Sequence, residues 1–415
     1  MSEMIFRPCV SQEKNKKVHN LFLGAVLLYK FWHNSPIFSF RYLPLIFLSL
    51  AFFAGHSSVK SPGLSSGAHG IDSVRVLKLG FAGDLMCHKP IFESSRVNSG
   101  SFDFNPIYKY ISEYLSAPDV MIGNLETVTA GKVKGYTGYP QFNTPDEYIS
   151  ALKKAGFDFL VTSNNHSMDR GEKGVLRTLE ILSANGIPST GTFQNETDRD
   201  SIRIINPNGI AVAILNYTFG TNGIPLPRGK DYLVNRIDTN LIKSDIEKAL
   251  SLKPDVLLLF YHFGTEYKRT PDEYQERIVE FSKRAGADII IGSHPHVVEK
   301  IEKYLTVGGR LDTGFVAYSL GNFLSNQQWR YADAGVILNL SLEKNLNSGR
   351  VRISEITPVP TMVYISRHSG KRQYYILPAS ENIDTVKLNF LKKSEIQRLK
   401  NSYSDTKGIL YSGAN

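Results

Sequence analysis

The sequence predicts an α/β fold in which two mixed sheets pack against each other as a sandwich with flanking helices. Two observations support this fold class. From Val74 onward, apolar runs typical of buried strands alternate with segments whose apolar residues recur every three or four positions, as in amphipathic helices. Further strand-like runs are less often separated by helices, and these predict a second, mixed sheet packed on the first.

The expected elements follow from these patterns along the chain. The strands of the first group, each running into polar residues, are 76–82, 119–122, 158–162, 255–261 and 287–291. The expected helices, three of which are followed by Gly within two residues, are 146–155, 174–184, 241–252 and 271–285. The strands assigned to the second sheet are 202–205, 210–217, 315–319, 335–341 and 350–358. The more polar end of the chain contains a candidate helix over 387–400.

Composition restricts the class of protein. The chain has 415 residues, of which 42% are hydrophobic and 21% charged, so it is neither globally disordered nor a multi-span membrane protein. Its formal net charge of +9 arises partly from basic residues in the first 41 positions. No block of Lys and Arg is interleaved with aromatic residues, so nucleic acid is not expected as a partner, whereas a positive surface suits an anionic substrate.

The N-terminal region predicts export or membrane attachment. The uncharged run 42–54 follows Arg41 and is short for a membrane span, which suits the apolar part of a signal peptide. Extending the run back through 37–40 would instead give an uncleaved membrane anchor. We expect a cytoplasmic segment with a signal peptide or anchor over 1–58, a Ser- and Gly-rich tether over 59–73, a folded domain over 74–362 and a C-terminal extension over 363–415. The folded domain is then expected in the cell envelope, outside the cytoplasm.

Five strands of the first group lead into side chains that can bind metal. These side chains are Asp84, Glu126, Asn165, His262, His294 and His296. Because the carboxyl ends of parallel strands meet at one edge of a sheet, we expect them to lie close together. Carboxylate, amide and imidazole groups together suit Mn²⁺, Zn²⁺ or Fe²⁺, and six of them predict two ions. Singly, each has a structural explanation, such as a turn cap for Asp84, a left-handed turn for Asn165 or a surface ion pair for Glu126.

The motifs around these residues resemble those of the CapA-type capsule synthesis proteins. That family is linked to poly-γ-glutamate capsule production and has a calcineurin-like metallophosphatase fold. The resemblance spans roughly 74–360, and its motifs, in the family's order, are 83–86, 124–126, 164–166 with Asp169 and Gly171, 262–264 with Glu266 and Tyr267, 292–297 and 319–323.

The resemblance implies a four-layer α/β/β/α metallophosphatase-like fold and a role for each residue. The six candidate ligands would hold two divalent ions (Mn, Fe or Zn), with Glu126 bridging them. His166 would act at the phosphate as general acid or electrostatic stabiliser, and Asp169 would assist it by orienting an imidazole, although Asp169 could instead cap the helix that follows. Met86 stands where the wider fold commonly has a histidine. Residues that would orient the ligands or contact substrate are Asn124, Asn164, Glu266, Tyr267 and Asn322.

Two functions follow from these features. The first is an exported or membrane-anchored hydrolase that cleaves a phosphoester or related anionic bond in the synthesis of poly-γ-glutamate capsule or another envelope polymer. The alternative is a non-catalytic component of a capsule synthesis complex that binds an anionic polymer and helps to export it. The apolar N-terminal segment and the positive charge balance favour this second function.

Overall fold

The computed structural model describes residues 73–98, 100–306, 310–367 and 370–412. The expected signal peptide or anchor over 1–58 and the tether up to residue 72 lie outside the described residues. Within the described ranges, no helix is both long enough and apolar enough to cross a membrane.

The first sheet has eight strands, in the order β14-β13-β12-β1-β2-β3-β4, with β11 pairing beside β1. Strands β1 to β4 are parallel, whereas β12, β13 and β14 continue the sheet from β1 in antiparallel pairs. The bounds are β1 Val74–Leu85, β2 Val120–Asn124, β3 Phe159–Val161, β4 Ser189–Thr190, β11 Asn322–Leu324, β12 Ala334–Asn345, β13 Val351–Ser366 and β14 Gln373–Pro378.

The second sheet has six strands, in the order β5-β6-β7-β8-β10-β9. Its four central strands are parallel, and an antiparallel strand lies at each edge. The bounds are β5 Arg203–Ile205, β6 Val212–Thr218, β7 Val256–His262, β8 Ile289–Ser293, β9 Ile301–Tyr304 and β10 Gly314–Ala317. Both sheets are therefore mixed, as the sequence predicted.

Eight α-helices and four 3-10 turns are present in the described ranges. The α-helices are α1 Lys89–Ser94, α2 Ser112–Leu115, α3 Glu147–Ala155, α4 Gly171–Ala184, α5 Glu196–Asp200, α6 Thr239–Ser251, α7 Glu273–Ala285 and α8 Lys393–Leu410. The 3-10 turns are η1 Asn105–Tyr108, η2 Lys132–Lys134, η3 Pro207–Gly209 and η4 Asp231–Leu233. All four expected helices, over 146–155, 174–184, 241–252 and 271–285, are found as α3, α4, α6 and α7.

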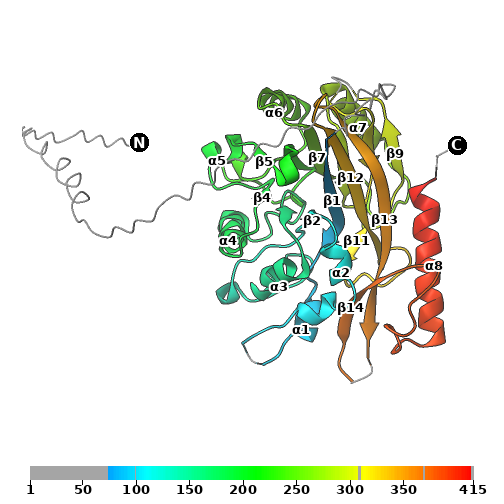
Figure 1. The fold of residues 1–415 in the computed structure, drawn as a ribbon. Coiled ribbons are helices and arrows are strands. Elements are labelled where there is room, and N and C mark those ends of the chain that lie inside the picture. Colours follow the sequence, from blue (N-terminus) through cyan, green and yellow to red (C-terminus); the bar gives the residue numbers. More distant parts are fainter. Residues whose placement is uncertain (1–72, 99, 307–309, 368–369, 413–415) are drawn as a thin grey trace, which may run out of the picture. The chain divides into compact units, whose positions relative to one another are not determined.

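These elements form four layers, which pack on one another through three apolar cores. The central core packs the two sheets face to face through residues such as Phe81, Phe260 and Ile291. A second core covers the outer face of the first sheet with α1, α3 and part of α4, and a third covers the outer face of the second sheet with α6 and α7. The predicted sandwich of two mixed sheets with flanking helices is thus confirmed (Figure 1).

The expected division of strands between the two sheets was wrong. Strands β7 and β8, assigned to the first sheet, pair with β6 and β10 in the second. Strands β12 and β13, assigned to the second sheet, join β1 in the first. Apolar runs reveal where strands occur, but pairing across more than 250 residues, as between Val76 and Glu343, leaves no local signal.

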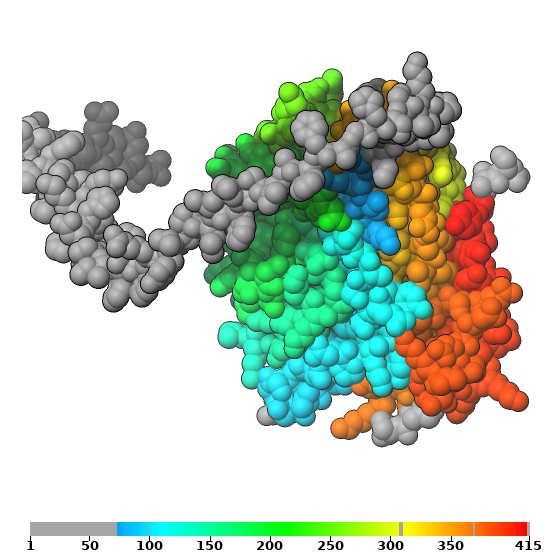
Figure 2. All heavy atoms as spheres, in the orientation of Figure 1, coloured from blue at the N-terminus to red at the C-terminus, as the bar shows by residue number. Residues whose placement is uncertain are grey.

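The last 50 residues add to the same folded unit. The expected domain boundary near Val363 falls within β13, and the chain beyond it supplies β14 and α8. Helix α8 lies against β12 and β13, and Figure 2 shows it on the surface beside them. It covers Lys393–Leu410 rather than the expected 387–400, because the side chain of Glu395 accepts a hydrogen bond from the Lys392 backbone N–H at the helix start and Leu399 and Leu410 are buried farther along.

Two glycines allow main chains to approach each other next to the candidate ligands. A Cβ at Gly83 would lie 1.9 Å from the backbone oxygen of Gly321, and one at Gly292 would lie 1.9 Å from that of Tyr318. The backbone N–H of Asp84 donates to the same Gly321 oxygen at 3.0 Å. Any side chain at Gly83 must therefore push apart the strands that place Asp84.

We predict that Gly83→Ala destabilises the protein by about 2 kcal/mol or more, because the clash is with backbone that cannot rotate away. The matched control is Gly220→Ala, where a Cβ would meet nothing within 4 Å. Urea unfolding of both variants measures the difference. Equal stability of the two variants would show that β1 and β11 are free to separate.

Candidate metal centre

The six candidate ligands lie at the carboxyl ends of strands from both sheets. Asp84 is the penultimate residue of β1, Glu126 follows β2 by two residues, and Asn165 lies in the turn after β3. His262 ends β7, and the segment with the two other histidines directly follows β8. Because β1, β2 and β3 are parallel, as are β7 and β8, each sheet brings its polar strand ends to one edge.

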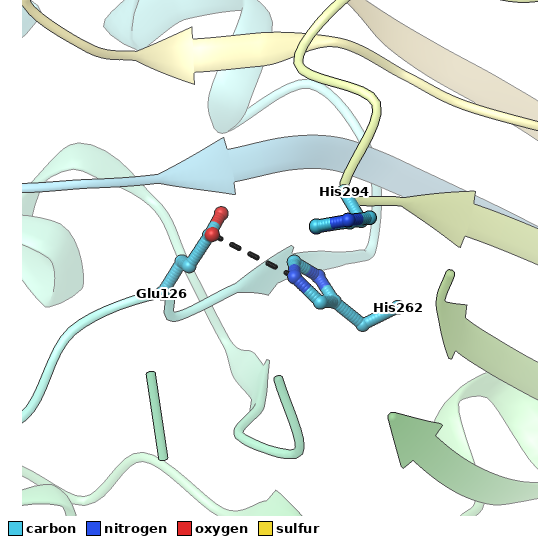
Figure 3. A group of neighbouring side chains, drawn as sticks. All are labelled: Glu126, His262 and His294. Atoms are coloured by element: carbon cyan, nitrogen blue, oxygen red, sulfur yellow. Dashed lines mark ion pairs between the residues drawn. The ribbon is translucent and has the colours of Figure 1, made fainter. Parts of the chain in front are cut away.

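The structure brings five of these residues together in two groups that share Glu126. One group is Glu126, His262 and His294, and the other is Asp84, Glu126 and His296; within each, the ligand atoms lie within 4.8 Å of one another. Oε1 of Glu126 is 3.6 Å from Nε2 of His262 and 3.8 Å from Nε2 of His296. Figure 3 shows Glu126 facing His262, with His294 alongside. The sixth residue, Asn165, places its Oδ1 2.9 Å from His262 Nε2.

The environment of the Glu126 carboxylate indicates whether these residues fit a metal. It is completely buried, and neither of its oxygens has a hydrogen-bond partner in the described chain; His294 Nδ1 also lacks one. Burial, and then the nearby Asp84 carboxylate, raise the pKa of Glu126 well above its ordinary value. A buried carboxylate without a partner is costly, and a cation between it and the imidazoles would remove that cost. The residues therefore fit a divalent metal.

The histidines are in the form that binds metal. Burial, and then neighbouring histidines, lower the pKa of His262 well below its ordinary value and that of His294 to about 3. Both rings are neutral at physiological pH, and a neutral imidazole has a lone pair to donate. Their protonation would therefore not compete with an ion near pH 7.

Hydrogen bonds orient the ligand side chains. Asp84 Oδ2 lies 2.9 Å from His296 Nδ1, which leaves Nε2 of that ring toward Glu126. Asn124 donates to the other Asp84 oxygen at 2.8 Å and lies 3.2 Å from His262 Nδ1. His262 Nδ1 is also 3.0 Å from the hydroxyl of Ser293, a contact that the sequence did not indicate. Carboxylate and amide partners of this kind fix the ring orientation of metal-binding histidines.

Asn164 holds two strand ends together beneath the ligands. Its side-chain amide donates to the backbone oxygen of Leu125 at 2.8 Å and its Oδ1 accepts from the His166 backbone N–H at 3.1 Å. This ties the turn after β3 to the segment after β2, one residue before Glu126.

His166 and Asp169 form a buried pair beside the ligands. Nδ1 of His166 is 2.8 Å from Asp169 Oδ2, and that oxygen also accepts the backbone N–H of Phe142 at 2.7 Å. The Phe142 ring packs edge-on against the imidazole, with centroids 4.7 Å apart. The imidazole is thus held from two sides, with Nε2 left for another partner.

The three remaining predicted residues have different environments. Glu266 is exposed, and its carboxylate belongs to a third possible metal group with His294 and His296. Tyr267 lines a cleft of about 710 Å³ that runs past His166 and His296. Asn322 is buried, and its amide donates to the Ala332 backbone oxygen at 2.7 Å, so it stabilises the chain after β11.

Three aromatic residues at the site gave no signal in the sequence. Phe219 packs at a tilt of 43° against His294 with ring centroids 4.5 Å apart, and Tyr139 and Trp329 line the cleft. All three lie outside helices and strands, so no periodic pattern marks them. His88, one residue from a cysteine, also lines the cleft; burial and then the nearby His296 lower its pKa to about 4.

Comparison with known proteins gives a family match and several relatives. A family model described as "Bacterial capsule synthesis protein PGA_cap" matches residues 78–327. Capsule biosynthesis protein CapA of Bacillus anthracis is 29% identical over 310 residues, which is 72% of each chain. PGA biosynthesis protein CapA of Bacillus subtilis is 27% identical over 332 residues, 77% of this chain and 81% of the relative.

Solved structures with a similar course of the chain are more distant. A phosphatase from Mycoplasma pneumoniae has a TM-score of 0.43 and 15% identity, covering 70% of this chain and 95% of its own. Calcineurin-like phosphoesterase YfkN from Bacillus subtilis has a TM-score of 0.41 and 14% identity, covering 81% of this chain and 100% of its own. Scores below 0.5 support no conclusion about activity.

We predict opposite effects of Glu126→Gln with and without metal. In chelator the variant should be at least as stable as the wild type, because it no longer buries a carboxyl group whose ionised form has no partner. Mn²⁺ at 100 times its dissociation constant should stabilise the wild type by about 2.7 kcal/mol. The variant should gain little, since Glu126 belongs to both groups.

Thermal unfolding with EDTA or Mn²⁺ measures both effects. Glu276→Gln, which replaces an exposed carboxylate on α7, should respond to Mn²⁺ like the wild type. Equal stabilisation of Glu126→Gln by Mn²⁺ would exclude Glu126 as a shared ligand.

Proposed function

The chain belongs to the PGA_cap family of bacterial capsule synthesis proteins, and we propose that it is a metal-dependent hydrolase of a phosphoester bond in the synthesis of a capsule or another envelope polymer. The observation that carries this proposal is the buried, unpartnered carboxylate of Glu126 between two sets of imidazoles. Poly-γ-glutamate is the polymer implied by the resemblance to CapA-type proteins. The relatives named for capsule and PGA biosynthesis support the polymer context.

We assign the ligands to two ions, Mn²⁺, Fe²⁺ or Zn²⁺. Asp84, Glu126 and His296 would hold one, and Asn165, His262, His294 and the shared Glu126 the other. Ions held there would supply positive charge for a phosphate group and activate a water molecule. Met86 lines the same cleft with a thioether, which is a poorer donor for such ions than an imidazole.

His166 is our candidate for the proton donor to the leaving oxygen. Asp169 would accept a hydrogen bond from His166 Nδ1, which would fix the ring orientation and direct Nε2 to a substrate. The Phe142 ring packs edge-on against the imidazole and restricts it further. Asn124 and Asn164 hold the strand ends that carry Asp84 and Glu126, and we assign them a positioning role.

We also propose that the folded domain works outside the cytoplasm, attached to the membrane through residues 1–58 or released after cleavage there. The proposal rests on the uncharged run 42–54 that follows Arg41. An envelope location agrees with the capsule biosynthesis names of the relatives.

We predict that His294→Ala and Asn165→Ala reduce Mn²⁺-dependent hydrolysis of bis(p-nitrophenyl) phosphate by about 100-fold or more. Asp169→Asn should cost about 10- to 100-fold, the range typical of a residue that orients another. Asn401→Ala, which removes an exposed amide on α8, serves as the control for Asn165→Ala.

The full chain loaded with Mn²⁺ is used for these assays, and polymer formation in cells is measured for the same variants. A metal-loaded protein inert on a broad phosphoester panel contradicts hydrolysis. If, in addition, the ligand variants still support polymer formation while deletion of 1–58 abolishes it, the non-catalytic export role is the better account.

We predict that added protease degrades residues 74–362 in intact cells or protoplasts, because that region lies beyond the membrane. Immunoblotting with an antibody against this region, with a cytosolic marker as control, follows the digestion. A fully protected, soluble protein in the cytosolic fraction would contradict the proposed location.

A further inference from the structure

Three exposed aromatic side chains form the rim of the cleft beside the candidate metal centre. Tyr139, Tyr267 and Trp329 line it and are 74%, 42% and 51% exposed. Only five aromatic side chains in the described chain are among its exposed large hydrophobic residues. Of the other two, Phe219 packs on His294, and Tyr411 ends the chain's last helix. Exposed aromatic surface is thus concentrated at this site, as expected where a ligand's apolar face is bound.

Two of these rings are fixed at an angle to each other. Tyr267 and Trp329 have centroids 5.4 Å apart and an interplanar angle of 68°. Gln327 donates to the Tyr267 hydroxyl at 3.1 Å, and the Tyr267 backbone N–H donates to Pro295 O at 2.7 Å. The two rings therefore form a corner. A sugar ring presents C–H groups in several directions and can contact both aromatic surfaces.

Amide side chains line the cleft between the rim and the candidate ligands. Gln141, Asn222, Asn326 and Gln327 all contribute to its wall. The Gln327 amide already bonds Asn322 and Tyr267, and Asn326 Oδ1 accepts from Tyr374. Gln141 and Asn222 are therefore the amides left to offer both donors and an acceptor, which a sugar hydroxyl needs. The wall therefore suits a substrate with several uncharged hydroxyl groups.

The charge of the cleft excludes a polyanion as the favoured occupant. None of the described residues that line it is Lys or Arg, and its acidic members are Asp169 and Glu266. A poly-γ-glutamate chain carries a carboxylate on every residue, and these would meet Glu266 without a cationic partner. Apart from His166 and any ion at the metal ligands, none of the described residues that line the cleft could offset the charge of a polyanion.

We propose that the cleft binds a sugar phosphate, with the phosphate at the metal ligands and the sugar ring against Tyr267 and Trp329. The position of the phosphate rests on the function proposed above, whereas the sugar subsite rests on the rim and the amide wall alone. Hydrolysis would break the bond between phosphorus and the sugar oxygen, add the water oxygen to phosphorus and leave the proton on the sugar.

Trp329 itself reports on this subsite. The chain has two tryptophans, so Trp32→Phe in the full chain leaves Trp329 as the single fluorophore. Glucose 1-phosphate with Mn²⁺ should change its emission saturably, and methyl α-glucoside in EDTA should do so at higher concentration. Tyr267→Ala should weaken both by about 10-fold, while Tyr411→Ala, which removes an exposed aromatic ring outside the cleft, should not.

The probes separate the two proposals. Tighter binding of an oligo-γ-glutamate or of AMP than of glucose 1-phosphate would overturn the sugar subsite, as would the absence of any saturable change with both sugars. A response to methyl α-glucoside in a protein that neither binds Mn²⁺ nor hydrolyses phosphoesters would support the subsite and contradict the proposed hydrolase.

Discussion

The buried carboxylate of Glu126 is the interaction on which the rest of the site depends. It lies completely out of solvent, close to two imidazole nitrogens and near a second carboxylate, and no side chain or backbone group of the described residues donates to it. A buried carboxylate that serves stability alone is normally hydrogen-bonded to a donor. The arrangement makes physical sense when a cation completes it, and the neutral state of His262 and His294 supplies the lone pairs that such a cation needs.

The fold is arranged so that this cluster can form. Two sheets face each other across one apolar core, and the carboxyl ends of their parallel strands deliver ligands from both sides. At these ends, Gly83 and Gly292 have no side chain that would keep neighbouring backbones apart. His294 and His296 have φ angles of 100° and 58°, a backbone conformation that costs about 1–3 kcal/mol per residue, so the loop after β8 is held in a strained form that directs both rings inward.

The sequence predicted which strand ends carry clustered polar side chains better than it predicted the arrangement around them. Apolar runs followed by Asp, Glu, Asn or His are local features, and the meeting of parallel strand ends at one edge predicted that these side chains lie close together. The division of strands between sheets failed, because β12 reaches β1 across most of the domain. Phe219, Tyr139 and Trp329 could not be predicted, since a loop residue's position depends on the elements that carry the loop. Asn322, a candidate for substrate contact, donates its amide N–H groups to Ala332 O and the side chain of Gln327, whereas its buried Oδ1 has no hydrogen-bond partner in the described chain.

The metal content of the purified protein shows directly whether Glu126 and its neighbours hold divalent ions. The full chain is loaded with Mn²⁺, dialysed, and measured by elemental analysis beside an Asp84→Asn, His262→Ala double variant, which removes one ligand from each group. We expect the wild type to retain between one and two Mn²⁺ ions per chain and the variant to lose most of this metal. The same residual content in both proteins, or none in the wild type, would contradict a metal centre built around Glu126.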